Sequence, residues 1–315
     1  MGIAARTLRR ADAAFWIVLA LAVGVGGASA LAGLPRLGEL LVPGGFVAEA
    51  HSQPRDFAAL SLIGPVMPSV SMASATKAAQ HFPVIAVVID DMGSDVALNR
   101  RAIALPRAVA LSFLPYPDET PALAREGARA GHDILVHVPM QAESRAEDPG
   151  PMALTTGLAP PEIIRRLDWA LSRVPGYIGI NNHMGSFYTQ NRAALVPVAE
   201  TMADRHIFFL DSRTTPASLV VPVARAYGVP SAARDVFLDD VQDPREVAVQ
   251  LAELEKDART NGVAIAIGHP HPVTLDVLAR WCANLKGYRL VPIAVAIRMK
   301  TERETGMSVA SLGGN

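Results

Sequence analysis

Five apolar runs of this sequence each end in an aspartate or a histidine. The polar residues at these ends are Asp90 with Asp91, His137, His183, Asp211, and His269 with His271. Such runs are typical of buried strands, and in α/β folds the carboxyl ends of parallel strands meet at one edge, where ligands bind and react. The sequence therefore predicts an α/β protein with a polar site at that edge.

Strand and helix patterns alternate after residue 82. The predicted buried strands cover residues 84–89, 108–113, 133–138, 177–181, 206–210, 233–238, 263–267 and 290–296. Helical patterns cover 121–130, 161–173, 192–204, 217–227, 244–260 and 274–285, and two of them begin with proline followed by an acidic residue. A (β/α) barrel takes roughly 250 residues. Seven or eight units in this stretch therefore predict a closed or nearly closed β/α barrel; a doubly wound open sheet is the alternative.

The N-terminus carries an apolar segment behind basic residues. Arg6, Arg9 and Arg10 precede an uncharged stretch over residues 13–35, which is long enough to cross a bilayer as a helix of about 20 residues. The Ala28–Ala30 triplet fits the small-residue pattern of a signal-peptidase site. We therefore predict a signal peptide or signal anchor over 1–35 and an extracytoplasmic, periplasmic location, secreted or anchored; a buried helix of a soluble protein is the alternative.

Composition sets further limits on the chain. Residues 36–81 contain scattered proline and serine and are predicted as a flexible linker, followed by the barrel over 82–299 and a disordered tail over 300–315. The 29 basic and 30 acidic residues give a net charge of -1, which provides no field that would favour nucleic acid. The single cysteine cannot form an intrachain disulfide.

The adjacent carboxylates of Asp90 and Asp91 form the first candidate site. Two such groups at a strand end repel each other unless a cation or hydrogen-bond donors stabilise them. A divalent metal ion would do so, with one carboxylate as a ligand and its neighbour as a base for water. The alternative is that Asp91 caps the following helix while Asp90 faces solvent.

Two histidines at other strand ends extend this candidate site. His137 interrupts an apolar stretch, and His183 has Asn181, Asn182 and a serine nearby, which are the polar partners that a ligating imidazole needs on its second nitrogen. An aspartate, two histidines and an open position form a common catalytic zinc set. The sequence therefore predicts a metal site; the alternative for each histidine is a satisfied position in the core.

Asp211 and Arg213 lie together after another apolar run. Either they pair within a loop, or Asp211 tunes a histidine or holds substrate while Arg213 orients the general base. We predict that Arg213, Asn182 and His271 bind substrate.

The run that ends at residue 268 is followed by two histidines, each before a proline. His269 and His271 are displayed by a loop that the prolines stiffen, and one of them is predicted as a general acid that protonates a leaving group near neutral pH. Asp239 and Asp240 follow a different apolar run. They either pair with this acid or are solvated loop carboxylates.

Over residues 82–298 the chain resembles a divergent polysaccharide deacetylase, a relative of the NodB-type carbohydrate esterases. The family motif Thr-Phe-Asp-Asp-Gly is similar to Ile89–Gly93, which implies that Asp90 is the base and Asp91 a metal ligand. The next family motif, Gly-His-Glu-Ile-Gly-Asn-His, resembles Gly131–His137.

The chain departs from the family pattern at one metal-ligating position. The family places a second histidine four residues after the last one of this motif, and here that position is Gln141. The order of the motifs then implies that His183 is the substitute ligand, that Asp211 stands at the catalytic aspartate of the fourth motif, and that His269 is the general acid.

The resemblance implies a fold and a reaction. The fold is a distorted (β/α)7 barrel, and the reaction is removal of an acetyl group from an N-acetylated sugar of an envelope or exported polysaccharide, with Zn²⁺ as the expected metal ion. In this reaction Asp90 takes a proton from water and His269 protonates the leaving amine. Another metal-dependent amide or ester hydrolase is one alternative. Because of Gln141, a catalytically silent envelope protein that binds glycan or a partner is the second; membrane contact is expected through the N-terminal segment only.

Overall fold

A computed structural model describes residues 82–306 of the chain. The predicted signal or anchor segment over 1–35 and the predicted linker over 36–81 lie outside the described residues. Within 82–306, no helix is both long and apolar enough to cross a membrane.

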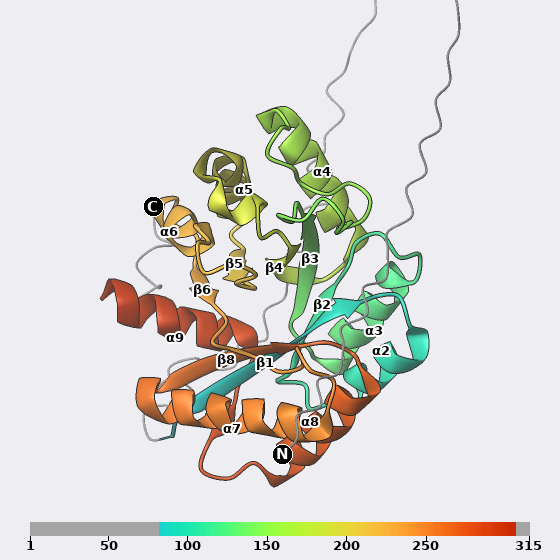
Figure 1. The fold of residues 1–315 in the computed structure, drawn as a ribbon, viewed down its shortest axis with the longest axis vertical. Helices are drawn as coiled ribbons and strands as arrows, with labels where there is room; N and C mark the ends of the chain where they lie inside the picture. The colour runs from blue at the N-terminus through green and yellow to red at the C-terminus, as the bar shows by residue number, and fades with distance from the viewer. Residues whose placement is uncertain (1–81, 307–315) are drawn as a thin grey trace, which may run out of the picture. The chain divides into compact units, whose positions relative to one another are not determined.

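Strands and helices alternate along the whole described part (Figure 1). The strands are β1 (Val84–Met92), β2 (Ala110–Phe113), β3 (Ile134–Met140), β4 (Tyr177–Met184), β5 (Phe208–Asp211), β6 (Ser231–Ala233), β7 (Val236–Phe237), β8 (Val263–Gly268) and β9 (Arg289–Leu290). The helices are α2 (Val96–Ile103), α3 (Thr120–Ala130), α4 (Pro160–Arg173), the 3₁₀ turn η2 (Tyr188–Gln190), α5 (Arg192–Asp204), α6 (Val220–Ala226), α7 (Pro244–Asn261), α8 (Pro272–Asn284) and α9 (Ile293–Thr305).

The strands form one parallel sheet that curves into a half-barrel. Their order is β6-β5-β4-β3-β2-β1-β8-β7, with β9 paired to β1. A doubly wound sheet reverses its strand order at a switch point, whereas here β1 to β6 follow the order of the chain and β8 joins the free side of β1. The parallel α/β architecture is therefore confirmed, in a form consistent with a (β/α) barrel.

One short segment spans the gap between the two ends of this sheet. The end strands β6 and β7 are separated by Arg234 and Asp235 alone. The Arg234 amide donates to the carbonyl of Asp211 on β5 at 3.0 Å, and the Asp235 amide donates to the carbonyl of Ile265 on β8 at 2.8 Å. The segment predicted as a single strand over 233–238 is thus two short strands that reach opposite edges.

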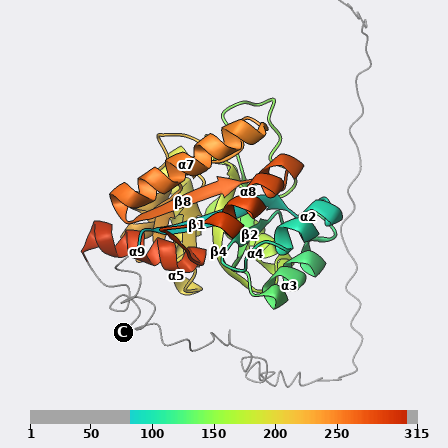
Figure 2. The same ribbon diagram turned by 90° about the horizontal axis from the view of Figure 1, so that it is seen from below.

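The helices pack on the outer face of the sheet, and α9 packs on the inner face. Strand side chains alternate between the two faces, so Ile85, Val87 and Ile89 of β1 join a core with α2 to α8. The intervening residues of β1 join a second core with Ile293 and Ile297 of α9. Figure 2 shows α9 lying along β1 and β8.

The C-terminal part of the described chain differs from the prediction. Residues 290–296 were expected to form a strand, but β9 covers Arg289–Leu290 and Pro292 caps the start of α9. Ile293, Ala296 and Ile297 are buried and are spaced as one face of a helix, so they fill the inner face better as a helix than as a strand. Residues 300–305, placed in the predicted tail, are the end of this helix.

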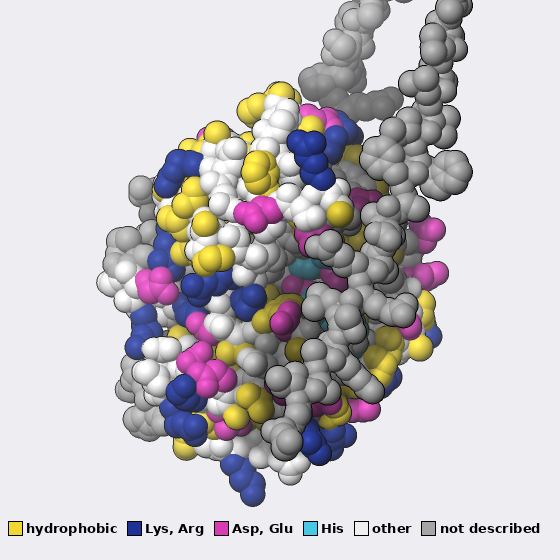
Figure 3. Space-filling model, in the orientation of Figure 1, with side chains coloured by type: hydrophobic (Ala, Val, Ile, Leu, Met, Phe, Trp, Pro, Cys, Tyr) yellow, Lys and Arg dark blue, Asp and Glu magenta, His cyan; other side chains and the backbone are white. Residues whose placement is uncertain are grey.

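Some histidine side chains reach the surface of the domain next to acidic side chains. They are visible near the centre of the face in Figure 3, next to aspartate or glutamate side chains.

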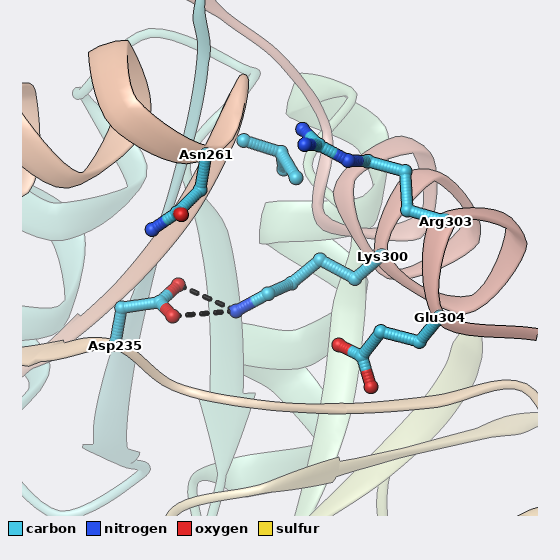
Figure 4. A pocket seen from close by; sticks show the side chains of 6 residues that line it. Asp235, Asn261, Lys300, Arg303 and Glu304 are labelled. Carbon is cyan, nitrogen blue, oxygen red and sulfur yellow. Dashed lines mark hydrogen bonds and ion pairs between the residues drawn. The ribbon is translucent and has the colours of Figure 1, made fainter.

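An ion pair closes the gap in the sheet from the side of α9. Lys300 Nζ lies 2.6 Å from both carboxylate oxygens of Asp235 and 3.2 Å from the Ala233 carbonyl (Figure 4). The Asp235 carboxylate also accepts a hydrogen bond from the amide of Ile265 at 2.8 Å. A cavity of about 350 Å³ lies beside the pair. Both partners of this ion pair are thus held by several contacts.

Candidate functional site

A β-bulge aims both members of the aspartate pair at one site. Ile89 of β1 is in register with Leu111 of β2, and Met92 with Phe113, so Asp90 and Asp91 together face a single residue of β2. The backbone of Asp91 is left-handed, with φ at 53°. In a regular strand adjacent side chains point to opposite faces, but a bulge re-aims one of them. The extra residue therefore lets both carboxylates point into the barrel.

Asp91 meets two histidines there. His137 Nε2 lies 3.3 Å from Asp91 Oδ1, and His183 Nδ1 lies 2.9 Å from the same oxygen. One potential ligand atom from each of the three residues lies within 4.8 Å of the others. Asp91 Oδ1 is buried, and no donor among residues 82–306 makes a well-oriented hydrogen bond to it. The orphaned oxygen and the Asp-His-His donor set fit a divalent ion such as Zn²⁺.

Asn181 joins the metal-binding candidates to the candidate base. Asn181 on β4 is in register with His137 on the neighbouring strand β3. Its Oδ1 accepts hydrogen bonds from His137 Nδ1 at 2.9 Å and from Ser112 Oγ at 2.5 Å. Its Nδ2 donates to the two oxygens of Asp90 at 2.8 and 2.9 Å. Because His137 donates through Nδ1, the lone pair of its neutral ring is on Nε2, where it can bind a metal ion beside the carboxylates.

Burial and neighbouring charges give the two carboxylates opposite character. Burial raises the pKa of Asp90, and the nearby His137 and His269 offset this only in part. Burial also acts on Asp91, but the imidazoles of His137 and His183 outweigh it and hold its pKa well below the usual range. Asp91 is therefore a permanently charged group, while Asp90 is the more basic of the two.

His269 faces the same site from β8 and is held by Asp239. Its Nδ1 lies 2.9 Å from Asp239 Oδ1, and its Nε2 lies 3.9 Å from Asp91 Oδ2. Burial alone would lower the pKa of His269, but the hydrogen bond and charge of Asp239 outweigh it and raise the pKa to about 9. Of the two open possibilities at positions 239 and 240, Asp239 is the buried partner, whereas Asp240 is exposed.

Asp211 and Arg213 belong to the loop after β5. The Asp211 carboxylate is buried and accepts a hydrogen bond from the amide of Arg213 at 2.8 Å. Burial raises its pKa. Within 82–306 no ion pair or hydrogen bond joins Asp211 to a histidine, and the Arg213 side chain is exposed. Their roles in catalysis and substrate binding stay predictions.

Asn182 and His271, which were also predicted to bind substrate, have partners within the protein. The Asn182 Oδ1 accepts from the Ser212 amide at 2.9 Å, and its Nδ2 donates to the Met184 carbonyl at 2.8 Å. His271 Nε2 lies 3.0 Å from Gln242 Nε2. Asn182 thus joins the loops that follow β4 and β5, and its contact with substrate stays a prediction.

Gln141, the position where the chain departs from the family pattern, points to a different part of the molecule. Its Oε1 accepts from the Thr156 amide at 3.0 Å and from Thr156 Oγ1 at 3.3 Å. The side chain therefore fastens the long connection between β3 and α4. The Asp-His-His cluster is complete without this position because His183 comes from β4.

Sequence reasoning missed several residues that support the site. Asn181 was read as a partner of His183, but the structure gives it to His137 and Asp90. Its position two residues before His183, on the same face of one strand, was an available signal. Arg234 was not singled out: its Nε donates to the Ser212 carbonyl at 2.5 Å, and its guanidinium lies 4.7 Å from the Phe237 ring centroid. No sequence signal marks the contact with Ser212, because the two residues lie 22 positions apart in loops that follow different strands.

Comparisons with known proteins identify the family of this chain. A family model described as divergent polysaccharide deacetylase matches residues 87–296. An uncharacterized protein of Haemophilus influenzae is 36% identical over 203 residues, which are 64% of this chain and 71% of that protein. The uncharacterized protein YibQ of Escherichia coli is 35% identical over 201 residues; the match spans 64% of this chain and 63% of YibQ, which is less than two thirds of its length.

A solved structure is similar as well. The crystal structure of an uncharacterized protein from Agrobacterium tumefaciens C58 has a TM-score of 0.66 and 26% sequence identity, over 68% of this chain and 89% of that one. The family match covers most of the described domain and includes every residue of the candidate site. The chain belongs to the divergent polysaccharide deacetylase family, and its family and fold are those of a polysaccharide-deacetylase-like hydrolase.

Proposed function

We propose that this protein is a metal-dependent hydrolase that removes the acetyl group from an N-acetylated sugar of an envelope or exported polysaccharide. The observation that carries the proposal is the bulge at Asp90 and Asp91, which brings a ligand-type carboxylate to His137 and His183 and a base-type carboxylate to His137. Two carboxylates whose environments separate their pKa values are typical of an acid-base site.

Asp91, His137 and His183 are the proposed ligands of a divalent ion, with Zn²⁺ expected. Bound there, the ion supplies Lewis-acid polarisation of the acetyl carbonyl and makes water more acidic. His137 is held for this role by Asn181, which occupies its Nδ1 and so directs its Nε2 toward Asp91.

Asp90 is the proposed general base. Its carboxylate is buried and both of its oxygens receive the amide of Asn181, which fixes its orientation beside Asp91. Because burial raises its pKa, it accepts a proton from water more readily than an ordinary aspartate does.

His269 is the proposed general acid. Two contacts with Asp239, one through the side chain and one through the backbone amide at 2.7 Å, fix the imidazole. With a pKa of about 9 it carries a proton at neutral pH, and its Nε2 faces the site, so it is placed to donate that proton to the leaving amine.

The family and the N-terminal sequence support the proposed substrate and location. The family supports a polysaccharide substrate, and N-acetylated sugars are the members of that class with an amide bond to hydrolyse. The apolar segment over residues 13–35 supports a location outside the cytoplasm.

The test is acetate release by the full chain, stripped of metal and reloaded with Zn²⁺, from chitooligosaccharides and peptidoglycan fragments. We expect release by the reloaded protein and its loss in His183→Ala, together with loss of bound metal. The matched control is His206→Asn, at an exposed histidine with φ at 54° where asparagine is tolerated.

Two results would contradict the proposal in different ways. A wild-type protein that retains no metal would remove the hydrolase proposal. A wild type that binds metal but releases acetate from neither substrate would favour the other amide or ester hydrolase, or the silent binding protein.

A further inference from the structure

A second group of ligand-type side chains lies beside the site and is not used as a metal centre in the proposed reaction. One ligand atom each from Asp239, His269 and His271 lies within 4.8 Å of the others. Asp239 follows β7, and the two histidines follow β8, each before a proline that stiffens the loop. The group is thus assembled at the ends of β7 and β8, and the two prolines restrict the backbone of the loop that carries the histidines.

Hydrogen bonds hold the Asp239 carboxylate in place, most of them through Oδ2. Its Oδ2 accepts from the His269 amide and from Thr274 Oγ1, both at 2.7 Å. Among residues 82–306 its Oδ1 has one hydrogen-bond partner, His269 Nδ1 at 2.9 Å. The side chain is almost completely buried. A fixed and buried carboxylate oxygen next to an imidazole nitrogen is a suitable first pair of ligands for a transition metal ion.

His271 completes the group. Its ring centroid lies 5.8 Å from that of His269, and its Nε2 is bonded to Gln242. Within residues 82–306 no hydrogen bond reaches its Nδ1. Because the side-chain amide nitrogen of Gln242 can only donate, Nε2 of His271 accepts this hydrogen bond and holds the lone pair of the neutral ring. A metal ion bound by Nε2 would take the place of the Gln242 amide.

We propose that Asp239, His269 and His271 form a second site for a divalent transition metal ion such as Zn²⁺, separate from the Asp91–His137–His183 site. The two sites adjoin, because His269 Nε2 lies 3.9 Å from Asp91 Oδ2. On binding, the ion takes the place of the proton shared by His269 Nδ1 and Asp239 Oδ1, and that proton is released to solvent.

Binding has a consequence that, unlike the binding itself, rests on the proposed function. An ion held at Nδ1 keeps His269 from forming the imidazolium that would give its Nε2 proton to the leaving amine, so the second equivalent of metal inhibits where the first activates. Zinc above one equivalent is then expected to lower acetate release by the wild type. In His271→Ala the inhibition should be weaker.

The experiment counts metal ions without relying on activity. The full chain and its variants are stripped with a chelator and dialysed against a small excess of Zn²⁺, and bound zinc is measured by elemental analysis. We expect two equivalents in the wild type, one in His271→Ala and one in His183→Ala. The matched control Asp240→Asn, at the exposed neighbour of Asp239, should keep two.

His271→Gln serves as a second variant, and thermal melting shows that each variant is folded. If the wild type binds one equivalent that His183→Ala loses and His271→Ala keeps, the second site is overturned while the proposed hydrolase stands. If it binds one equivalent that only the His271 variants lose, the second site stands and the Asp91–His137–His183 site is overturned. No bound zinc would overturn both.

Discussion

Two carboxylates of this domain, Asp235 and Asp91, differ in the partners that surround them. Asp235 receives Lys300 on both oxygens at 2.6 Å and the amide of Ile265 on one of them. Asp91 has a left-handed backbone and a buried Oδ1 with no well-oriented donor among the described residues. Asp235 is neutralised by a lysine and a backbone amide, whereas Asp91 is stabilised by two imidazoles, which can exchange their protons for a metal ion. The contrast separates the part of the sheet that the ion pair closes from the part that is proposed to bind metal and substrate.

The largest expected effect on metal binding and activity is that of replacing Asp91. Asp91→Asn removes the central charge from the cluster with His137 and His183, so bound metal and acetate release should both fall to background. The free energy of unfolding of the metal-free protein at neutral pH should also fall, because the imidazoles of His137 and His183 stabilise the charge of Asp91. Elemental analysis, an acetate assay and thermal melting check the three parts; a variant that keeps its metal would break the contrast.

The next effect concerns the neighbouring carboxylate. Asp90→Asn removes the proposed base while Asp91 and both histidines remain, so acetate release should fall by about 10² to 10⁴ with metal content unchanged. The comparison with Asp240→Asn, at an exposed position, controls for loss of one negative charge. Equal activity of the two variants would remove Asp90 from the mechanism.

Removal of the Asn181 side-chain amide should have a smaller effect on metal affinity and activity. Asn181→Ala deletes the contacts with His137 Nδ1 and with both oxygens of Asp90. Loss of such a supporting partner lowers metal affinity or activity by about 10- to 100-fold. Zinc titration of the metal-free protein measures the change, and an unaltered affinity and rate would show that packing alone orients His137.

A variant of the Lys300–Asp235 ion pair tests whether this carboxylate serves stability alone. Lys300→Met leaves Asp235 without its partner in a partly buried position, which should lower the free energy of unfolding by about 2 kcal/mol while metal content and activity per folded molecule persist. Denaturant unfolding measures this, with Lys286→Met at an exposed lysine as the control. Loss of metal in the folded Lys300 variant would show that the two regions are not independent.

The smallest expected effect is a change in pH dependence. His269 must be protonated to act as the acid, so activity should decline as the pH rises through about 9. Asp239 is what raises this pKa against the effect of burial, so the decline should occur at lower pH in Asp239→Asn. A pH–rate profile with a fixed zinc concentration measures both, and an unshifted alkaline limb in the variant would assign that limb to another group.

Much of the architecture followed from local sequence patterns. The helix over 192–204 has the predicted bounds, and proline begins α4 and α7 where it was expected. The short apolar run near residue 293 was misread because a buried strand and a buried helix share the same composition. Its helical form depends on the inner face of the sheet that it covers.

The sequence by itself determined which edge of the sheet carries the site, because parallel strands that end in Asp91, His137, His183 and His269 bring those ends together. It did not determine which side chains meet. The tertiary structure decided that a bulge turns Asp91 inward, that Asn181 serves His137, and that Asp239 rather than Asp240 holds His269. The physical reason is that strand periodicity fixes the face of a residue, while its partners depend on the register between strands that are distant in the chain.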